Sequence, residues 1–308
     1  MDIIEQAAKR LAELRRAGVE LAPVAPAPEP GETVVRPAEI VAPSAAAPAS
    51  TAYASRRIEL DMERIARHDI LTPHAERSHL ADELRVIKRP LLRNVAGKGV
   101  APVKNANLIM VTSAVPGEGK SFTAANLAMS IAMELDHTVL LVDADVARPS
   151  LPEIFGLPPS KGLLDVLVDK DTDLSQVMLR TNVEKLSILP SGSRHLHATE
   201  LLASDAMANL LDDLATRYSD RVIIFDSPPL LVTTEARALA SHMGQVVLVV
   251  RAERTTHSEV RHALSLLELA PVKMLMLNQA ADPSANGHSY GYGYGYGYEK
   301  KNDGGEAR

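Results

Sequence analysis

Short apolar runs alternate with amphipathic windows along residues 105–280. The runs typical of buried strands are 108–112, 138–143, 185–190, 222–226, 245–250 and 272–277. The windows with helical spacing are 120–135, 198–218, 233–243 and 256–269. Near-continuous runs of Val, Ile and Leu that alternate with helices indicate a parallel sheet with helices on both faces. The pattern therefore predicts a doubly wound, mostly parallel α/β domain, in which ligands bind beyond the carboxyl ends of the strands.

The pattern changes outside this domain. We expect the chain to divide into segments 1–20, 21–55, 56–104, 105–282 and 283–308. The first has helical apolar spacing and balanced charges, which predicts an amphipathic helix that either docks on a partner or is merely solvated. The second is rich in Pro and Ala and predicts a disordered, extended tether. The third predicts a helical lead-in, with a helix over 76–89 that Pro90 ends. Its basic excess is either a contact surface or a solvated face.

Composition narrows the functions open to a chain of 308 residues. The formal net charge of −6 argues against a protein that coats nucleic acid, so no nucleic-acid partner is expected. The absence of cysteine excludes disulfides, thiolate zinc sites, iron–sulfur clusters and cysteine catalysis. No run approaches the ~18 apolar residues needed to cross a bilayer, and the first residues lack the apolar core of a secretory signal. The expected location is therefore cytoplasmic.

The strongest chemical signal is AVPGEGKS at residues 114–121, after the first expected strand and at the start of the first expected helix. It fits the pattern (A/G)-x4-G-K-(S/T) of a phosphate-binding loop. Glycines let backbone N–H groups curl around phosphates, Lys120 adds a positive charge at the β and γ oxygens, and Ser121 supplies a hydroxyl for Mg²⁺. The ATP-binding loop is expected to comprise Val115, Pro116, Gly117, Glu118, Gly119, Lys120, Ser121 and Phe122.

Carboxylates end two other expected strands. Asp143 and Asp145 follow the second strand, and Asp226 ends the run at 222–226. An acidic group beside a phosphate-binding loop serves Mg²⁺, and a second one can orient or deprotonate a nucleophile. A lone strand-end aspartate could simply cap the next turn. Two strands that each deliver a carboxylate to the same edge favour a Mg²⁺-dependent site.

The loop at 114–121 and the stretches 140–149 and 223–229 resemble the Walker A, Walker A′ and Walker B motifs of the bacterial tyrosine kinases. Members of this family are P-loop enzymes of exopolysaccharide and capsule assembly, unrelated to eukaryotic kinases. ELRVIKRPLL at 83–92 and FDSPPLLVTTEAR at 225–237 are most similar to the exosortase-associated tyrosine autokinases. The resemblance covers roughly 58–298.

The resemblance implies an activity and a set of residue roles. The chain would be an ATP-dependent protein-tyrosine autokinase with ATP and Mg²⁺ as cofactors. The implied catalytic residues are Lys120, Asp143 and Asp145, and the implied magnesium positions are Ser121, Asp145 and Asp226. Asn278, after the last expected strand, would meet the adenine base.

The resemblance also implies partners. These are a membrane-spanning polysaccharide chain-length regulator as activator, further copies of the chain as a homo-oligomer, and a protein-tyrosine phosphatase. The regulator would hold the chain at the inner membrane. Family members often carry Glu-x2-Arg-x2-Arg in a helix tied to ring-like oligomers. Here the best alignment is Asp82-x2-Arg85-x2-Lys88, which leaves the oligomer number open because Arg and Lys are not equivalent in a bidentate pair.

Half of the aromatic residues lie in YGYGYGYGY at 290–298. Alternating glycine disfavours a helix and predicts a flexible tail with a phenol at every second residue. On composition alone such a repeat could be a low-complexity spacer. Beside the kinase motifs it reads as a phosphoacceptor cluster that serves a neighbouring subunit. The expected acceptors are Tyr290, Tyr292, Tyr294, Tyr296 and Tyr298.

Two other classes remain open on the sequence. Partitioning ATPases share the fold, but their loop carries an extra lysine where this chain has Val115. A regulatory scaffold could signal through its nucleotide state without transferring phosphate. His195 and His197 lack a third ligand at metal-binding spacing and are expected to be solvated. Arg251, Arg254 and Thr255 follow a strand and either line the nucleotide site or lie on the surface.

Overall fold

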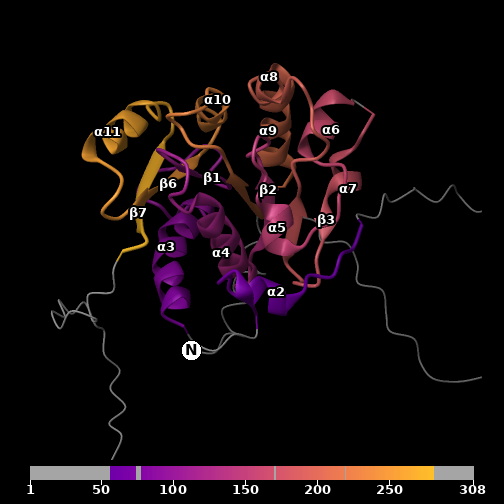
Figure 1. Cartoon of the computed structure of the whole chain (residues 1–308), viewed down its shortest axis with the longest axis horizontal. Coiled ribbons are helices and arrows are strands. Elements are labelled where there is room, and N and C mark those ends of the chain that lie inside the picture. The colour runs from indigo at the N-terminus through magenta and orange to yellow at the C-terminus, as the bar shows by residue number, and fades with distance from the viewer. Residues whose placement is uncertain (1–55, 74–77, 170, 219, 281–308) are drawn as a thin grey trace, which may run out of the picture. The chain divides into compact units, whose positions relative to one another are not determined.

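The structure, a computed structural model, describes residues 56–73, 78–169, 171–218 and 220–280. The expectations for 1–20, for the tether at 21–55 and for the tyrosines at 290–298 lie outside these ranges. Within them, a seven-stranded sheet has the order β3-β4-β2-β5-β1-β6-β7 and is covered by helices (Figure 1). The predicted mostly parallel α/β architecture is confirmed.

The strands begin and end close to the expected positions. They are β1 Leu108–Ser113, β2 Thr138–Asp143, β3 Leu179–Arg180, β4 Leu186–Leu189, β5 Arg221–Asp226, β6 Gln245–Arg251 and β7 Val272–Asn278. Every neighbouring pair is parallel except β3 with β4, which is antiparallel. The expected runs missed β3, because two residues at the sheet edge are too short for a periodic signal.

Alternation along the central strands builds two cores. In β1, Leu108 and Met110 face one core, while Ile109 and Val111 face the other. The first core contains side chains of helices α6 to α11 and the second those of α2 to α5. Because both faces of each central strand are buried, the strands read as continuous apolar runs rather than alternating ones.

The described helices are α2 Met62–Arg67, α3 His79–Val95, α4 Lys120–Ala132, α5 Leu151–Phe155, α6 Leu163–Val168, α7 Leu174–Val177, α8 Ala198–Leu202, α9 Asp205–Arg217, α10 Glu235–Ala240 and α11 His257–Ser265. The prediction of a single helix over 198–218 is wrong, because this stretch forms two helices, α8 and α9. Ser204 separates them as the N-cap of α9, where its hydroxyl accepts a hydrogen bond from the Met207 N–H.

The expectation that Pro90 ends the lead-in helix is also wrong, since α3 continues to Val95. Proline removes one hydrogen bond, to the carbonyl of Val86 four residues before it. Both residues are exposed, Val86 to 74%, so water can satisfy that carbonyl. Leu84 and Leu91, on the buried face of the same helix, pack into the core. Their burial outweighs the local cost of proline.

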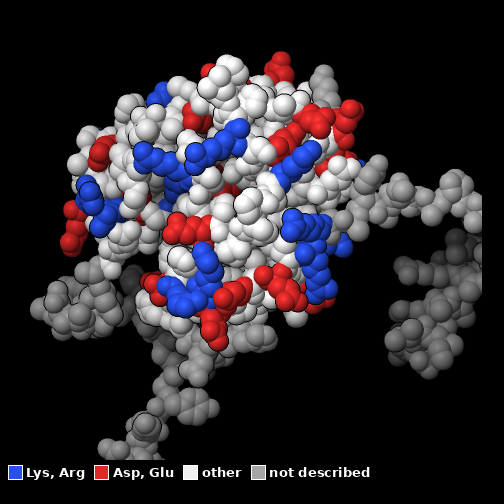
Figure 2. All heavy atoms as spheres, turned by 45° about the vertical axis from the view of Figure 1, so that its right-hand side comes forward, with Lys and Arg blue, Asp and Glu red and all other residues white. Residues whose placement is uncertain are grey.

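The charged surface shows no large face of one sign in the view of Figure 2, where Lys and Arg alternate with Asp and Glu. In the described ranges no helix combines the length and the apolar character needed to span a bilayer.

Candidate nucleotide-binding site

The predicted phosphate loop lies between the carboxyl end of β1 and the start of α4. Gly117 and Gly119 have φ angles of +84° and +94°, a conformation that L side chains rarely adopt. A Cβ atom on Gly119 would also overlap the Asn278 side-chain amide. Since α4 begins at Lys120, its free N–H groups and positive dipole end lie at the loop. The loop is therefore shaped to accept an anion.

Lys120 lies among the strand-end carboxylates. Its Nζ is 2.6 Å from Asp145 Oδ2 and 3.6 Å from Asp226 Oδ1. The same nitrogen is 3.3 Å from the Ser121 hydroxyl. Burial alone would lower the pKa of Lys120, but Asp226 and Asp145 outweigh burial and hold it above its ordinary value. Lys120 is therefore a permanent positive charge.

Asp143 and Asp226 are both fully buried. Asp143 Oδ2 accepts a hydrogen bond of 3.3 Å from the Leu151 N–H, and Asp226 Oδ2 accepts one of 3.3 Å from the Ser150 hydroxyl. Burial raises the pKa of both carboxyls, helped at Asp143 by the negative charge of Asp226. The other oxygen of each has no hydrogen-bond partner among the described residues.

These orphaned oxygens fit a divalent cation. No group of three or more His, Asp or Glu side chains in the described ranges is arranged to hold a metal alone. Mg²⁺ seldom needs such a cage, because it binds one or two carboxylates together with phosphate oxygens and water. Asp226, Asp145 and the Ser121 hydroxyl form a donor set of that kind around Lys120.

Glu118 holds the phosphate loop against the loop after β6. Its buried carboxylate accepts hydrogen bonds from the Val115 N–H at 2.7 Å and the Arg251 N–H at 3.3 Å. It also accepts one from the Thr255 hydroxyl. The sequence pattern does not reveal this role, because the position is variable in the loop motif. Only its burial and its contacts in the folded chain identify the role of Glu118.

Asn278 lies over the same loop. Its side-chain amide donates a 2.9 Å hydrogen bond to the Glu118 carbonyl. The end of β7 is thereby joined to the phosphate loop, which is where the resemblance places a residue that meets the base. The structure brings several predicted residues together at the carboxyl ends of the strands. They are Val115 to Ser121, Asp143, Asp145, Asp226 and Asn278.

Other candidates fall elsewhere. The Phe122 side chain packs against the core on the α3 side, so it would contribute to the loop only through its backbone. His195 and His197 are exposed, as expected, and Arg254 lies on the surface. Thr255 belongs to the site through its bond to Glu118.

The residues of the lead-in motif make contacts within the chain. Lys88 is only 6% exposed; its Nζ donates to the Ser130 carbonyl at 2.6 Å and pairs with Glu134 at 2.7 Å. The hydrogen bond from Lys88 lowers the pKa of Glu134. Arg85 pairs with Asp82 within the same helix. Lys88 therefore joins α3 to α4 within the chain, and its charge is not available to a neighbouring subunit in this conformation.

The sequence of this chain is similar to those of known proteins. A family model described as an AAA domain matches residues 106–271. The putative tyrosine-protein kinase EpsB of Ralstonia nicotianae is 37% identical over 179 residues, which are 58% of this chain and 23% of EpsB. The putative tyrosine-protein kinase CapB of Staphylococcus aureus is 34% identical over 54% of this chain and 72% of CapB. The chain thus spans about a quarter of the Ralstonia protein and most of the staphylococcal one.

Solved structures agree with the sequence relatives. The kinase domain of the Escherichia coli tyrosine kinase ETK superposes with a TM-score of 0.58 at 28% identity, over 79% of this chain and 94% of that domain. The chimerical protein CapA2B2 gives a TM-score of 0.56 at 30% identity, over 72% of this chain and 93% of the chimera. These relatives, together with the sheet and phosphate loop of this chain, show that it belongs to the bacterial tyrosine-protein kinase family of P-loop proteins.

Proposed function

We propose that this chain is a Mg²⁺-ATP-dependent protein-tyrosine kinase that phosphorylates the tyrosines of its own C-terminal segment. The observation that carries the proposal is the position of Lys120, between a glycine-rich anion loop and the carboxylates Asp145 and Asp226. The names of the relatives give the class of reaction. The repeat at 290–298 supplies phenols in the same chain.

The residue roles follow from charge and position. Loop N–H groups and the start of α4 would bind the phosphates, and Lys120 would leave Asp145 to contact the β and γ oxygens. Ser121, Asp145 and Asp226 would hold Mg²⁺, which when bound neutralises charge on the phosphates. Asn278 would contact the base, because it already covers the loop.

A tyrosine hydroxyl needs a base, because its pKa of about 10 keeps it protonated at neutral pH. Asp143 is our candidate, with Asp145 assisting at the metal. Burial raises the pKa of Asp143, which makes it a better proton acceptor than an exposed carboxylate. Since Asp143 is fully buried, the acceptor tyrosine can reach it only after a local rearrangement that exposes its carboxylate.

We propose that the acceptors Tyr290, Tyr292, Tyr294, Tyr296 and Tyr298 are modified in trans within a homo-oligomer. By analogy with relatives, a membrane-spanning polysaccharide chain-length regulator would activate the kinase and hold it at the inner membrane. A protein-tyrosine phosphatase would reverse the modification. Exopolysaccharide or capsule polymerisation and export would be the regulated process.

A mixing experiment tests activity and direction together. One protein carries Lys120→Met with an intact tail, and the other has an intact site with all five tail tyrosines changed to Phe. We expect phosphotyrosine on the tail of the Lys120→Met chain only when both proteins and Mg²⁺-ATP are present. Alone, the Lys120→Met chain should lose at least ~100-fold in rate, because the transferred phosphate loses its main positive charge.

Other outcomes would contradict parts of the proposal. An unmodified tail in the mixture, with self-modification of the wild type, would show transfer in cis. ATP hydrolysis without phosphotyrosine in any mixture, with the response to a partner retained by the five-Phe chain, would instead support a nucleotide-dependent scaffold.

A further inference from the structure

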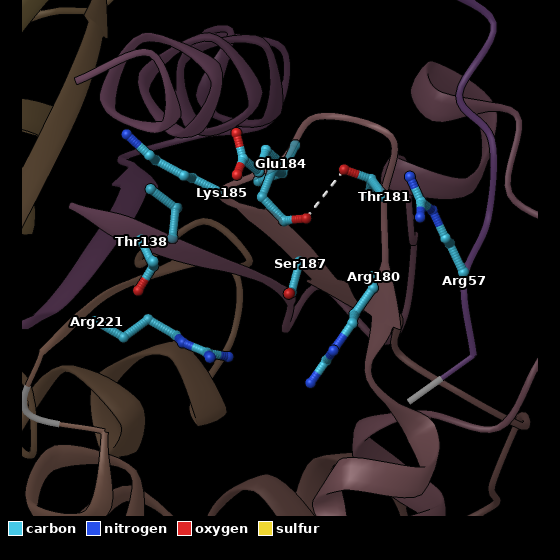
Figure 3. A pocket seen from close by; sticks show the side chains of 10 residues that line it. Arg57, Thr138, Arg180, Thr181, Glu184, Lys185, Ser187 and Arg221 are labelled. Atoms are coloured by element: carbon cyan, nitrogen blue, oxygen red, sulfur yellow. Dashed lines mark hydrogen bonds between the residues drawn. The ribbon is translucent and has the colours of Figure 1, made fainter. Parts of the chain in front are cut away.

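A second polar pocket lies at the end of the sheet opposite the phosphate loop. It is lined by the first residues of β2 and β5, Thr138 and Arg221, and by residues of β3, β4 and the turn between them, with a volume of about 460 Å³ (Figure 3). At their other ends, β2 and β5 finish in Asp143 and Asp226 of the nucleotide site. Six-residue strands separate the two ends by roughly 20 Å. A ligand in this pocket would therefore bind apart from the nucleotide.

The pocket is basic. Its charged lining residues are Arg57, Arg180, Lys185, Arg221 and Glu184. Lys185 already donates to the carbonyls of Glu134 and Leu135 at 2.8 Å each. Neither the arginines nor Glu184 belong to any ion pair formed by the part of the chain that the structure describes. The pocket lining therefore carries three guanidinium groups and one carboxylate outside these ion pairs.

Two of the arginines converge. Figure 3 shows the side chains of Arg180 and Arg221 reaching toward one another beside Ser187, while Arg57 lies at the rim near Thr181. The guanidinium carbon of Arg221 lies 5.0 Å from the centre of the Tyr218 ring, and its Nη1 is 3.8 Å from Met178 Sδ. These contacts hold the Arg221 side chain in place without neutralising its charge. The two positively charged guanidinium groups repel each other unless an anion lies between them.

Two of the residues that line the pocket carry buried polar atoms without a partner. The Arg221 Nε and the Thr138 hydroxyl are buried and make no hydrogen bond within the described ranges. Leaving a buried donor unsatisfied costs about 1–3 kcal/mol. Because Nε and a terminal nitrogen of one guanidinium form a planar fork, an oxyanion can accept from both. The hydroxyl of Thr138, the residue paired with Arg221 in the sheet, supplies a further donor.

We propose that this pocket binds a phosphate group, held between Arg180 and Arg221 with Thr138 as an additional donor. The binding requires no kinase activity and is independent of the proposed function. Its structural effect follows from the backbone around Arg180. The Ile58 N–H donates to the Arg180 carbonyl at 2.8 Å, and the Arg180 N–H donates to the Arg56 carbonyl at 2.9 Å. A bound anion would therefore stabilise β3 and the lead-in segment beside it.

Two sources of the phosphate group can be separated. One probe is inorganic phosphate, and the other is a synthetic peptide of residues 288–299 with phosphorylated tyrosines, alongside its unmodified form. Amide hydrogen exchange of the full chain, with Mg²⁺-ADP present to occupy the phosphate loop, locates the binding. The variant is Arg180→Gln with Arg221→Gln. Its control, Arg67→Gln with Arg93→Gln, removes two exposed charges elsewhere.

We expect phosphate to slow exchange at 56–60 and 179–187 in the wild type and in the control. The Arg180/Arg221 variant should bind at least ~10-fold more weakly, since two charge-assisted contacts are lost. Because Arg180 is exposed, the single Arg180→Gln chain repeats the test without disturbing the core. Tighter binding of the phosphopeptide would identify another copy's tail as the source, and equal affinity would indicate a free anion. No protection at these residues, or equal protection in the Arg180/Arg221 variant, would overturn the proposal.

Discussion

Around Lys120, three carboxylates share a space from which water is largely excluded. Asp143, Asp145 and Asp226 are each 5% exposed or less, and Lys120 faces two of them. Such crowding costs stability in the absence of ligand, because one lysine cannot compensate three buried acids. The same crowding suits a site that receives Mg²⁺, since the cation then supplies the partner that the buried carboxylate oxygens lack.

The substitution Asp143→Asn tests this cost. Burial raises the pKa of Asp143 in the folded state, so the folded protein holds this proton at pH values where the unfolded chain has lost it. Stability therefore falls as pH rises from the ordinary carboxyl pKa through the raised folded pKa. Asp143→Asn removes that loss, so its melting temperature relative to wild type should rise as the pH increases above the ordinary carboxyl range. Asp136→Asn, at an exposed carboxyl, should show no such trend. A melting-temperature difference between Asp143→Asn and wild type that does not change with pH would contradict the account.

Glu118 provides a second test at this scale. Glu118→Gln keeps the shape but leaves at least one of its three donors, from Val115, Arg251 and Thr255, without an acceptor. We expect a loss of about 1–3 kcal/mol in unfolding free energy and at least ~10-fold weaker ADP binding. Denaturant unfolding and nucleotide titration measure the two effects. Glu253→Gln removes a negative charge from an exposed site in the loop after β6. This control should change neither the unfolding free energy nor the affinity for ADP. Normal ADP affinity in Glu118→Gln would argue against a positioning role.

At the scale of elements, buried strands were predictable and short edge elements were not. The run at 138–143 gives β2 to the residue, because both faces of the strand are buried. Local pattern also located the loop at 114–121 and the three aspartates. Local pattern could not reveal β3 or the arginine pocket that β3 helps to line. Both depend on strands distant in sequence coming together. The contacts of Glu118 likewise join residues more than a hundred positions apart.

Helix α3 shows a local rule that tertiary packing overrides. Pro90 is a strong helix breaker, yet α3 continues to Val95 because its buried face packs into the core. Pro90→Ala restores a backbone donor at an exposed position. It should therefore raise the free energy of unfolding by about 1–3 kcal/mol. Arg89→Ala, at the exposed preceding position, should stay within about 0.5 kcal/mol of wild type. Destabilisation by Pro90→Ala would mean that proline has a packing role that its exposure conceals.

At the scale of the whole molecule, phosphorylation should change assembly through charge. Each phosphate adds about −1.5 to −2 at pH 7, so five within residues 290–298 would add roughly −8 to −10. A tail so charged should be repelled from a site that already holds three buried carboxylates. Sedimentation velocity of fully phosphorylated and unmodified protein should therefore show a smaller assembly for the phosphorylated form. Identical sedimentation in both states would exclude such a switch.

The central claim is that the phosphate loop transfers a γ-phosphoryl group to tyrosine rather than only to water. Mass spectrometry of the purified chain, after incubation with Mg²⁺-ATP and the cytoplasmic part of a membrane activator, measures this directly. We predict phosphotyrosine within residues 290–298, absent without Mg²⁺ and absent in Lys120→Met. Release of inorganic phosphate while those tyrosines stay unmodified would contradict the account.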